Sequence, residues 1–162
     1  MRARDEMRVM AYLALNHGAE GLWTFAYDYL HFTQGSEWKW VELSELVREL
    51  RGLDRLWRVP VAPHGALAAS DSALDLGLRS YAGNDYLVAV NTAPRPVSAG
   101  IRLPAAAKLQ AVRVGADSPL EPAIHTARVD ADAPFEPAST IAGAWIRDTW
   151  RPYAVHVYKI SP

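Results

Sequence analysis

The sequence predicts an α+β protein with three parts: a helix–strand–helix segment over residues 1–59, a linker over residues 60–69 and a small antiparallel β-sandwich over residues 70–162. Two observations carry this prediction. In the first part, apolar residues recur at helical spacing on either side of a short apolar run. After the linker, short β-rich segments alternate with turns that contain glycine, asparagine or proline, which is typical of an antiparallel sandwich.

The first helix is predicted over residues 4–17. Its apolar residues fall on one stripe at helical spacing, and they are Met7, Met10, Ala11, Ala14 and Leu15. Asp5 and Glu6 lie in the first turn, where the helix dipole favours negative charge. Gly18 is placed to end the helix with a positive φ angle, which glycine adopts without steric cost.

A strand over residues 21–27 and a second helix over residues 40–57 follow. The strand is apolar almost throughout, which predicts a strand covered on both faces. The second helix has an apolar stripe made of Leu43, Leu46, Val47, Leu50, Leu53 and Trp57. Glu49 is assigned to its charged outer face. Pro60 and Pro63 then end regular structure, which indicates the linker.

The β-sandwich is predicted from its alternating strands. Leu74, Leu76 and Leu78 alternate with polar or small residues, and turn-forming residues at 83–85 predict a hairpin with the run 86–90. Further strands are expected at 97–103, 109–114, 123–129 and 153–160. Trp145 and Trp150 are expected to be buried and to close the core, whereas in exposed positions they would form a carbohydrate-binding surface on the sandwich. His156 is expected to be a surface residue or a hydrogen-bonded core residue rather than a ligand.

Composition narrows the function. The chain has 162 residues, 17 basic and 18 acidic, with a net charge of −1, so it lacks the basic surface of a nucleic-acid or polybasic membrane binder. Without cysteine it forms no disulfide or thiolate metal site, and no histidine pair has ligand spacing, so no metal or other cofactor is expected. No signal peptide is recognisable, and we expect a soluble protein with the cytoplasm slightly favoured over other compartments.

Several motifs occur in a characteristic order. Arg8-Val-Met10, Tyr12, Ala14-Leu15, Gly18-Ala19, Gly21-Leu22 and Tyr27 resemble the seventh helix and eighth strand of (β/α)-barrel glycoside hydrolases. The second helix resembles the helix that closes such a barrel. Tyr86-Leu-Val-Ala-Val-Asn91 and Pro152-Tyr-Ala-Val-His-Val-Tyr158 resemble strands of the β-sandwich that often follows it. The resemblance implies a C-terminal part of a glycoside hydrolase, since a whole barrel needs roughly 250 residues.

The resemblance also implies that the catalytic pair is missing. Retaining enzymes of this type use two carboxylates, which in the family lie on the fourth and seventh strands and hence upstream of Met1. The end of the eighth strand commonly supplies an aromatic residue to a sugar subsite. The candidates for sugar binding are therefore Trp23, Tyr27 and Tyr29, which alternate on one side of a strand, together with Asp28 and Trp38.

Other interpretations stay open. Asp28 and Glu37 could form the carboxylate pair of a self-contained small glycosidase, although Glu37 also fits the start of a helix. The chain could instead be a stand-alone carbohydrate-binding module. In each case the expected partner is a carbohydrate. The apolar strand at 21–27 would lack a neighbour outside a barrel, which predicts a homo-oligomer or domain swap through that strand.

Overall fold

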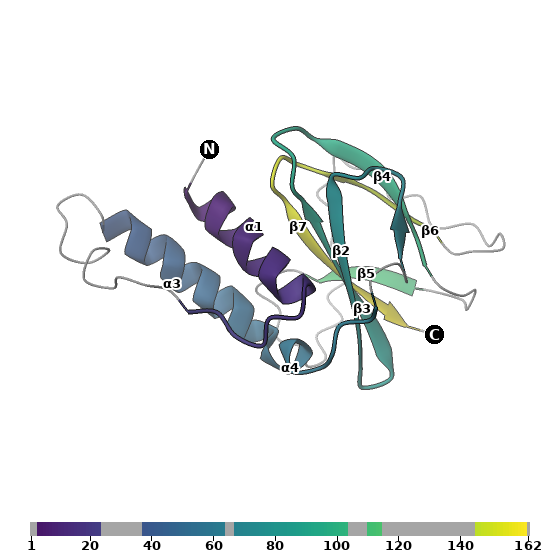
Figure 1. Cartoon of the computed structure of the whole chain (residues 1–162), viewed down its shortest axis with the longest axis horizontal. Helices are drawn as coiled ribbons and strands as arrows, with labels where there is room; N and C mark the ends of the chain where they lie inside the picture. The colour runs from purple at the N-terminus through teal and green to yellow at the C-terminus, as the bar shows by residue number, and fades with distance from the viewer. Residues whose placement is uncertain (1–2, 24–36, 64–66, 104–109, 115–144, 162) are drawn as a thin grey trace.

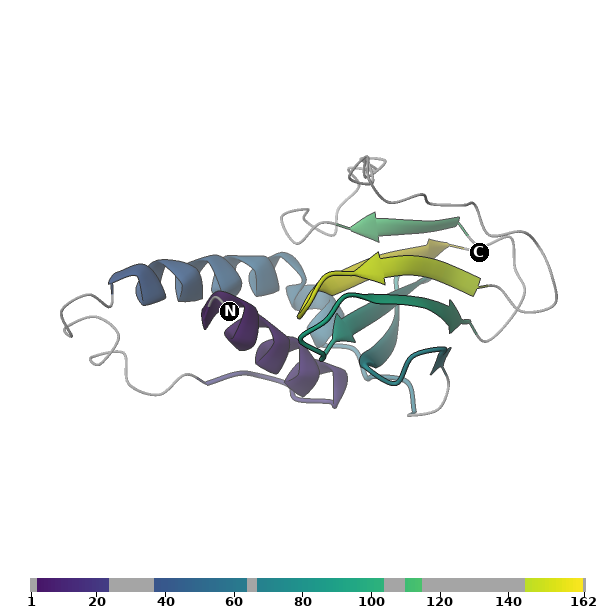
Figure 2. The same cartoon turned by 90° about the horizontal axis from the view of Figure 1, so that it is seen from above.

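The computed structural model describes residues 3–23, 37–63, 67–103, 110–114 and 145–161. These residues form a mixed fold of helices and antiparallel sheets, as the predicted α+β class requires. The described part has three layers: a helical layer, a four-stranded sheet and a three-stranded sheet (Figures 1 and 2). The four-stranded sheet is the middle layer, so its two faces contact different partners.

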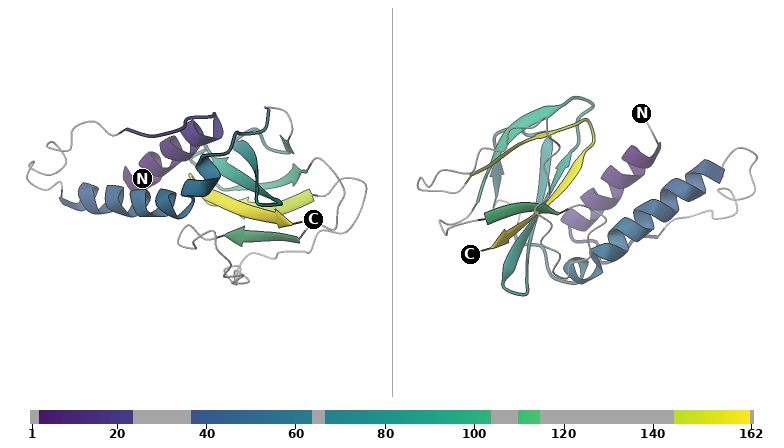
Figure 3. Two further views of the ribbon diagram at one scale, coloured as in Figure 1. Left: turned by 90° about the horizontal axis from the view of Figure 1, so that it is seen from below. Right: turned by 180° about the vertical axis from the view of Figure 1, so that it is seen from behind.

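The helical layer consists of α1 (Ala3–Asn16), α3 (Glu37–Gly52) and the short α4 (Asp54–Trp57). The predicted end of the first helix is confirmed. Gly18 has a φ of 90°, and the amide of Ala19 donates to the carbonyl of Ala14 at 2.9 Å, as in a Schellman cap. Helices α1 and α3 lie side by side and run in the same general direction (Figures 1 and 3).

The two sheets are antiparallel throughout. The three-stranded sheet has the order β1 (Ala68–Ala69), β4 (Val97–Arg102) and β6 (Trp145–Trp150). The four-stranded sheet has the order β2 (Leu74–Tyr81), β3 (Asn84–Asn91), β7 (Val155–Ser161) and β5 (Gln110–Val114). Strands β2 to β5 and β7 match predicted strands, whereas β6 was not predicted and β1 falls within the predicted linker.

The predicted hairpin between β2 and β3 is confirmed, with its turn slightly earlier than expected. Tyr81 pairs with Asn84, which leaves Ala82 and Gly83 as a two-residue loop. Both loop residues have positive φ, 50° and 76°, and this backbone shape suits the right-handed twist of a hairpin. Glycine reaches this region without cost, and Ala82 is held there by the pairing on either side.

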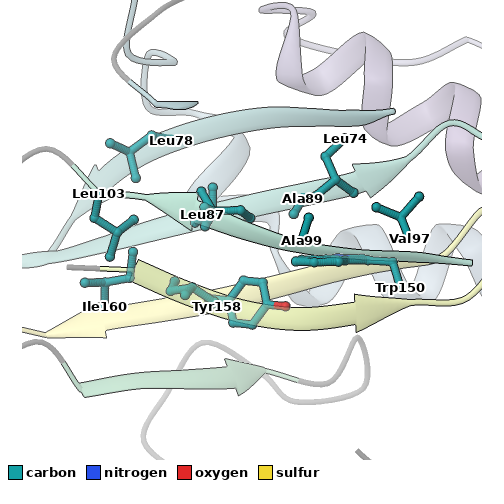
Figure 4. Close-up of a cluster of buried hydrophobic side chains, with 12 residues drawn as sticks. Leu74, Leu78, Leu87, Ala89, Val97, Ala99, Leu103, Trp150, Tyr158 and Ile160 are labelled. Carbon is teal, nitrogen blue, oxygen red and sulfur yellow. The ribbon is translucent and has the colours of Figure 1, made fainter. Parts of the chain in front are cut away.

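Two apolar cores lie on opposite faces of the four-stranded sheet. One fills the space between the sheets, with Leu87, Trp150 and Tyr158 among its members (Figure 4). The other lies between the sheet and the helices, and includes Tyr12, Val88 and Val157. Neighbouring residues of a strand point to opposite faces of the sheet, and both faces are covered here. Strand β3 is therefore buried from Tyr86 to Asn91 without interruption.

Several burial predictions were wrong. Met10 is 69% exposed and Val47 is 41% exposed, while Glu49, assigned to an outer face, is 4% exposed. The cause is the double contact of α1, which packs against both α3 and the sheet and therefore buries Tyr12 instead of Met10. Trp150 is buried as expected, whereas Trp145 is 41% exposed on the outer face of β6.

The predicted strand at 21–27 is described only at its start. Residues 21–23 are not in a strand, and residues 24–27 lie outside the described residues. Trp23 is 92% exposed, so the expected burial of this segment on both faces does not hold at that position. The weak strand candidate at 123–129 also lies outside the described part. No helix in the described ranges has the length and apolar character needed to cross a membrane.

The close approach of α1 to β2 gives a test of the fold. A methyl group at Gly77 would overlap the side chain of Asn16, which is fully buried. We expect Gly77→Ala to lower the free energy of unfolding by about 1–3 kcal/mol, because the helix must shift away from the sheet. Gly21→Ala is the matched control, since nothing lies within 4 Å of the added methyl. Equal urea midpoints for the two variants would contradict this packing.

Candidate functional site

The C-terminal end of α1 is held by one side of β2. Asp75, Gly77 and Arg79 alternate along β2 and face the helical layer, because a strand places every second residue on the same face. All three contact the last residues of α1. The sequence suggested that these small and polar positions lie on a half-buried strand, and the structure places them against the helix end.

Asp75 and Asn16 form the first contact between β2 and α1. The Asn16 side-chain amide donates to Asp75 Oδ1 at 2.8 Å and lies 3.4 Å from the carbonyl oxygen of Val88. His17 Nε2 lies 2.8 Å from Asp75 Oδ2. The two contacts of the amide nitrogen use the donors of this fully buried asparagine, whereas its Oδ1 has no hydrogen-bond partner.

Arg79 forms the second contact. Its side chain is 2% exposed, donates through Nη2 to the carbonyl of Leu15 and through Nε to the carbonyl of Val59 at 3.2 Å. The Leu15 carbonyl belongs to the last turn of α1, where the helix dipole favours a cation. The guanidinium also lies over the ring of Trp57, 5.1 Å from its centroid. Burial lowers the pKa of Arg79 below its usual value.

A cavity of about 840 Å³ opens beside this contact. Its wall combines residues 17–20, which follow α1, with Asp54 and residues 57–61 around α4, and with Arg79. Trp23 lies three residues beyond the cavity-lining Glu20 and is almost fully exposed. The exposed indole of Trp23 thus closely follows, in the chain, residues that line the same cavity as the buried Arg79.

Most of the candidate residues from the sequence lie outside the described part of the chain. Trp23 is described, whereas Tyr27, Asp28 and Tyr29 are not. Glu37 and Trp38 begin α3, and only their backbone is described. The structure therefore gives no geometry for the sugar platform or for the Asp28–Glu37 pair. Sequence reasoning missed Arg79, because an arginine in an alternating strand is typical of a solvated face.

A second polar cluster fixes α1 to α3. Glu49 Oε1 accepts hydrogen bonds from Arg8 Nε and from the Tyr12 hydroxyl, both at 2.7 Å. Burial, together with the Glu49 charge, raises the pKa of Tyr12 far above its ordinary value. The hydroxyl therefore stays protonated and serves as a donor to the carboxylate. This carboxylate is engaged in holding two helices together, which is a structural role rather than that of a glycosidase acid.

A third polar cluster lies between the sheets. Asp148 Oδ2 accepts from the Tyr158 hydroxyl at 2.5 Å and lies 2.9 Å from His156 Nδ1. His156 is 4% exposed and stacks on Trp150, with ring centroids 5.3 Å apart. It is thus a core histidine with hydrogen-bond partners. Among the described residues, no group of three or more histidine, aspartate and glutamate side chains is arranged to hold a metal ion.

The Asp148 cluster makes stability depend on acid pH. Burial alone would raise the pKa of Asp148, but hydrogen bonds involving His156 and Tyr158 hold this pKa below its usual value. A folded-state pKa below the unfolded one stabilises the protein above the unfolded value, and this contribution is lost as pH falls through the folded pKa. We expect the stability difference between the native chain and Asp148→Asn to be largest above about pH 4 and to shrink below it.

Urea unfolding at a series of pH values from 2 to 7 measures this difference. Tyr158→Phe is the informative companion variant, because it removes one hydrogen bond to Asp148 while keeping the ring in the core. Without this hydrogen bond the folded-state pKa of Asp148 moves towards its unfolded value, so the acid-induced loss of stability should be smaller than in the native chain and should end at a higher pH. A difference between native chain and Asp148→Asn that stays constant down to pH 2 would contradict the assignment.

No family model, curated protein or solved structure matches this chain. The resemblance to barrel glycoside hydrolases therefore rests on the sequence motifs. Among the described residues, two surface features are the exposed Trp23 and the cavity beside Arg79. Similarity to a known protein assigns no role to either of them.

Proposed function

We propose that the chain is the C-terminal part of a protein related to glycoside hydrolases, with a structural and sugar-binding role and without a complete catalytic pair. The observation that carries the sugar-binding role is the 92% exposure of Trp23 immediately after the α1 cap. The adjacent Leu22 is 45% exposed, and neighbouring exposed apolar side chains are typical of an interaction surface. A flat indole face stacks well on the C–H face of a sugar ring.

The arrangement of the helices supports the relationship to a (β/α) barrel. Helices α1 and α3 run in the same general direction (Figures 1 and 3), as consecutive helices of a βα repeat do. Residues 18–23 turn back from the C-terminal end of α1 (Figure 2), so the chain returns before α3 begins. A sandwich packed against these helices agrees with the order of motifs in the sequence.

Binding to polysaccharides tests the sugar-binding role. We expect the chain to bind at least one member of a panel of cellulose, xylan, starch and β-galactan in a saturable manner. Trp23→Ala should weaken that binding at least about tenfold, because the stacking surface is removed. Trp145→Ala is the matched control, since Trp145 is 41% exposed on β6 of the three-stranded sheet. Circular dichroism establishes that both variants are folded.

Each outcome of this experiment is informative. Binding lost in Trp145→Ala and kept in Trp23→Ala would contradict the proposal and favour a stand-alone carbohydrate-binding module. Absence of binding across the panel would contradict a sugar-binding role.

An activity assay with aryl glycosides tests the absence of a catalytic pair. Turnover that disappears in Asp28→Asn and in Glu37→Gln would contradict this absence and favour a compact glycosidase.

Self-association is a further part of the proposal. Leu22 and Trp23 are adjacent and exposed, and Met10 is 69% exposed on α1. Such apolar residues favour contacts between copies when nothing else covers them. We expect light scattering after size exclusion to show a dimer or larger species at high concentration, shifted towards monomer in a Leu22→Ser/Trp23→Ser double variant. A monomer at every concentration would contradict self-association through this segment.

A further inference from the structure

The outer face of the three-stranded sheet carries an exposed indole with two arginines beside it. Strand pairing sets Arg102 of β4 directly opposite Trp145 of β6, and Gly100 directly opposite Arg147. Residues paired in this way lie on one face of a sheet, and so does every second residue of a strand. Trp145 is 41% exposed, and both arginines are exposed as well. We call the surface formed by Gly100, Arg102, Trp145 and Arg147 the outer-sheet patch.

Gly100 allows the indole to lie close to the backbone of β4. Cε3 of Trp145 is 3.0 Å, and Cγ of Arg147 is 3.9 Å, from the position that a Cβ atom at Gly100 would occupy. The indole therefore fills the space that a side chain on β4 would take, and the stem of Arg147 borders the same space. A ring that is already held in place loses little conformational freedom when a ligand stacks on it, which favours binding.

The outward side chains of β1, β4 and β6 carry two positive charges and no negative charge. Asp148 is the one acidic residue in these strands, and it points inward to His156 and Tyr158. Within the described ranges, no ion pair joins Arg102 or Arg147 to a carboxylate. The other outward residues of these strands are small or uncharged, and they are Ala68, Ser98 and Thr149. The charge of the outer-sheet patch is therefore complementary to that of an anionic ligand.

The groups around the indole favour a sugar ring that bears a carboxylate. An exposed indole face stacks on the C–H face of a pyranose ring. A planar guanidinium matches a carboxylate, to which it donates two parallel hydrogen bonds. The exposed hydroxyls of Ser98 and Thr149 are 2.9 Å apart, and each keeps the capacity for a further hydrogen bond, as sugar hydroxyls require. A uronate ring combines the three kinds of group that these side chains recognise.

We propose that the outer-sheet patch binds an acidic polysaccharide made of uronate rings. Trp145 stacks on one ring, and the two arginines pair with the carboxylates of that ring and of its neighbour. Arg102 lies across the strand pair from Trp145, whereas Arg147 lies two residues along β6, about 7 Å away, so the two guanidiniums approach the stacked ring from different sides. The three-stranded sheet and the helices lie on opposite sides of the four-stranded sheet (Figure 1), so this site is separate from Trp23 and does not depend on sugar binding by that residue.

Single-stranded nucleic acid is the competing ligand, because it also combines stacking on aromatic side chains with contacts to arginine. Its binding depends on a series of cations that follow the phosphate backbone. The outer-sheet patch has two cations, and the chain as a whole has a net charge of −1. These charges favour a ligand whose carboxylates lie on the stacked rings themselves, and nucleic acid becomes one of the outcomes of the test.

Titration of the full chain with defined polymers tests the proposal. Polygalacturonate and alginate are the uronate probes, and the fully methyl-esterified form of each is its uncharged counterpart with the same rings. Poly-L-glutamate supplies carboxylates without sugar rings, and oligothymidylate represents nucleic acid. We expect isothermal titration calorimetry at neutral pH to show saturable binding of at least one polyuronate, at least about tenfold tighter than of its methyl ester. Added salt should weaken this binding, because it screens exposed charges.

The comparison polymers define the results that would overturn the proposal. No binding of either polyuronate, or equal binding of a polyuronate and its methyl ester, would contradict recognition of uronate rings. Binding of poly-L-glutamate as tight as that of the polyuronates would show that sugar rings are not recognised. Tighter binding of oligothymidylate than of both polyuronates would overturn the proposal in favour of single-stranded nucleic acid.

Variants of the patch locate the polyuronate on the outer face of the sheet. Trp145→Ala should weaken its binding at least about tenfold, because the stacking surface is removed. An Arg102→Gln/Arg147→Gln double variant should have a similar effect, because both charged partners of the carboxylates are lost. Since both arginines are exposed, this double variant keeps the test decisive if Trp145→Ala does not fold. Normal binding by the double variant would contradict the proposal.

Two controls separate this site from other parts of the molecule. An Arg48→Gln/Arg51→Gln double variant removes the same charge from exposed positions of α3 and should bind polyuronates normally. A loss as large as in the double variant of the patch would contradict the location. Trp23→Ala should also bind polyuronates normally, whatever its effect on neutral polysaccharides, so the two sugar-binding proposals succeed or fail separately. Loss of polyuronate binding in Trp23→Ala with normal binding in Trp145→Ala would overturn the assignment to this patch.

Discussion

The middle sheet of this protein has to be covered on both faces, and the other layers follow from that requirement. Strands β3 and β7 direct Leu87 and Tyr158 to one side and Val88 and Val157 to the other. A sheet with two apolar faces is stable in water only between two further layers. The three-stranded sheet supplies one layer and the α1–α3 pair supplies the second. Without the helices, the Val88 and Val157 face of the four-stranded sheet would therefore lie open to water.

Polar contacts determine how the helical layer is positioned on that sheet. The apolar contacts between α1 and the sheet are non-directional, whereas Glu49 accepts from Arg8 and Tyr12, and Asp75 accepts from Asn16. Gly77 allows the Asn16 side chain to approach the backbone of β2. Arg79 then holds the last turn of α1. The cavity lined in part by Arg79 adjoins this set of contacts.

The local signals of the sequence predicted much of the fold. The Gly18 cap, the β2–β3 hairpin and most strands depend on residues close together in the chain, and these predictions are confirmed. The faces of α1 and α3 depend on distant partners, so periodicity alone placed Met10 and Glu49 on the wrong sides. Strand β6 was missed because its apolar residues are interrupted by Arg147 and Asp148, and Asp148 points inward only because His156 and Tyr158 meet it there.

The candidate site was less accessible to sequence reasoning than the fold. Trp23 was selected as an aromatic residue at a strand end, while its actual setting is an exposed position after a helix cap. Arg79 and Trp57 gave no separate signal, because an alternating arginine and an apolar-stripe tryptophan are common structural residues. Arg79 and Trp57 come together because β2 lies under the end of α1. Arg79 is 64 residues away in the chain from Leu15, the α1 residue to which it donates. A contact between residues so far apart in the chain leaves no local pattern in the sequence from which it could be predicted.

The position of β7 has a consequence for how the protein folds during synthesis. This strand pairs with β3 on one side and β5 on the other, and it is also reached by Arg8 through the carbonyl of Val155. It follows every other described strand in the chain, so the ribosome releases it after all its neighbours. Until then, β2–β3 and β5 cannot join into one sheet, and the apolar face under α1 stays incomplete. Until β7 emerges, the nascent chain thus exposes unpaired sheet edges, at which association with other chains competes with folding.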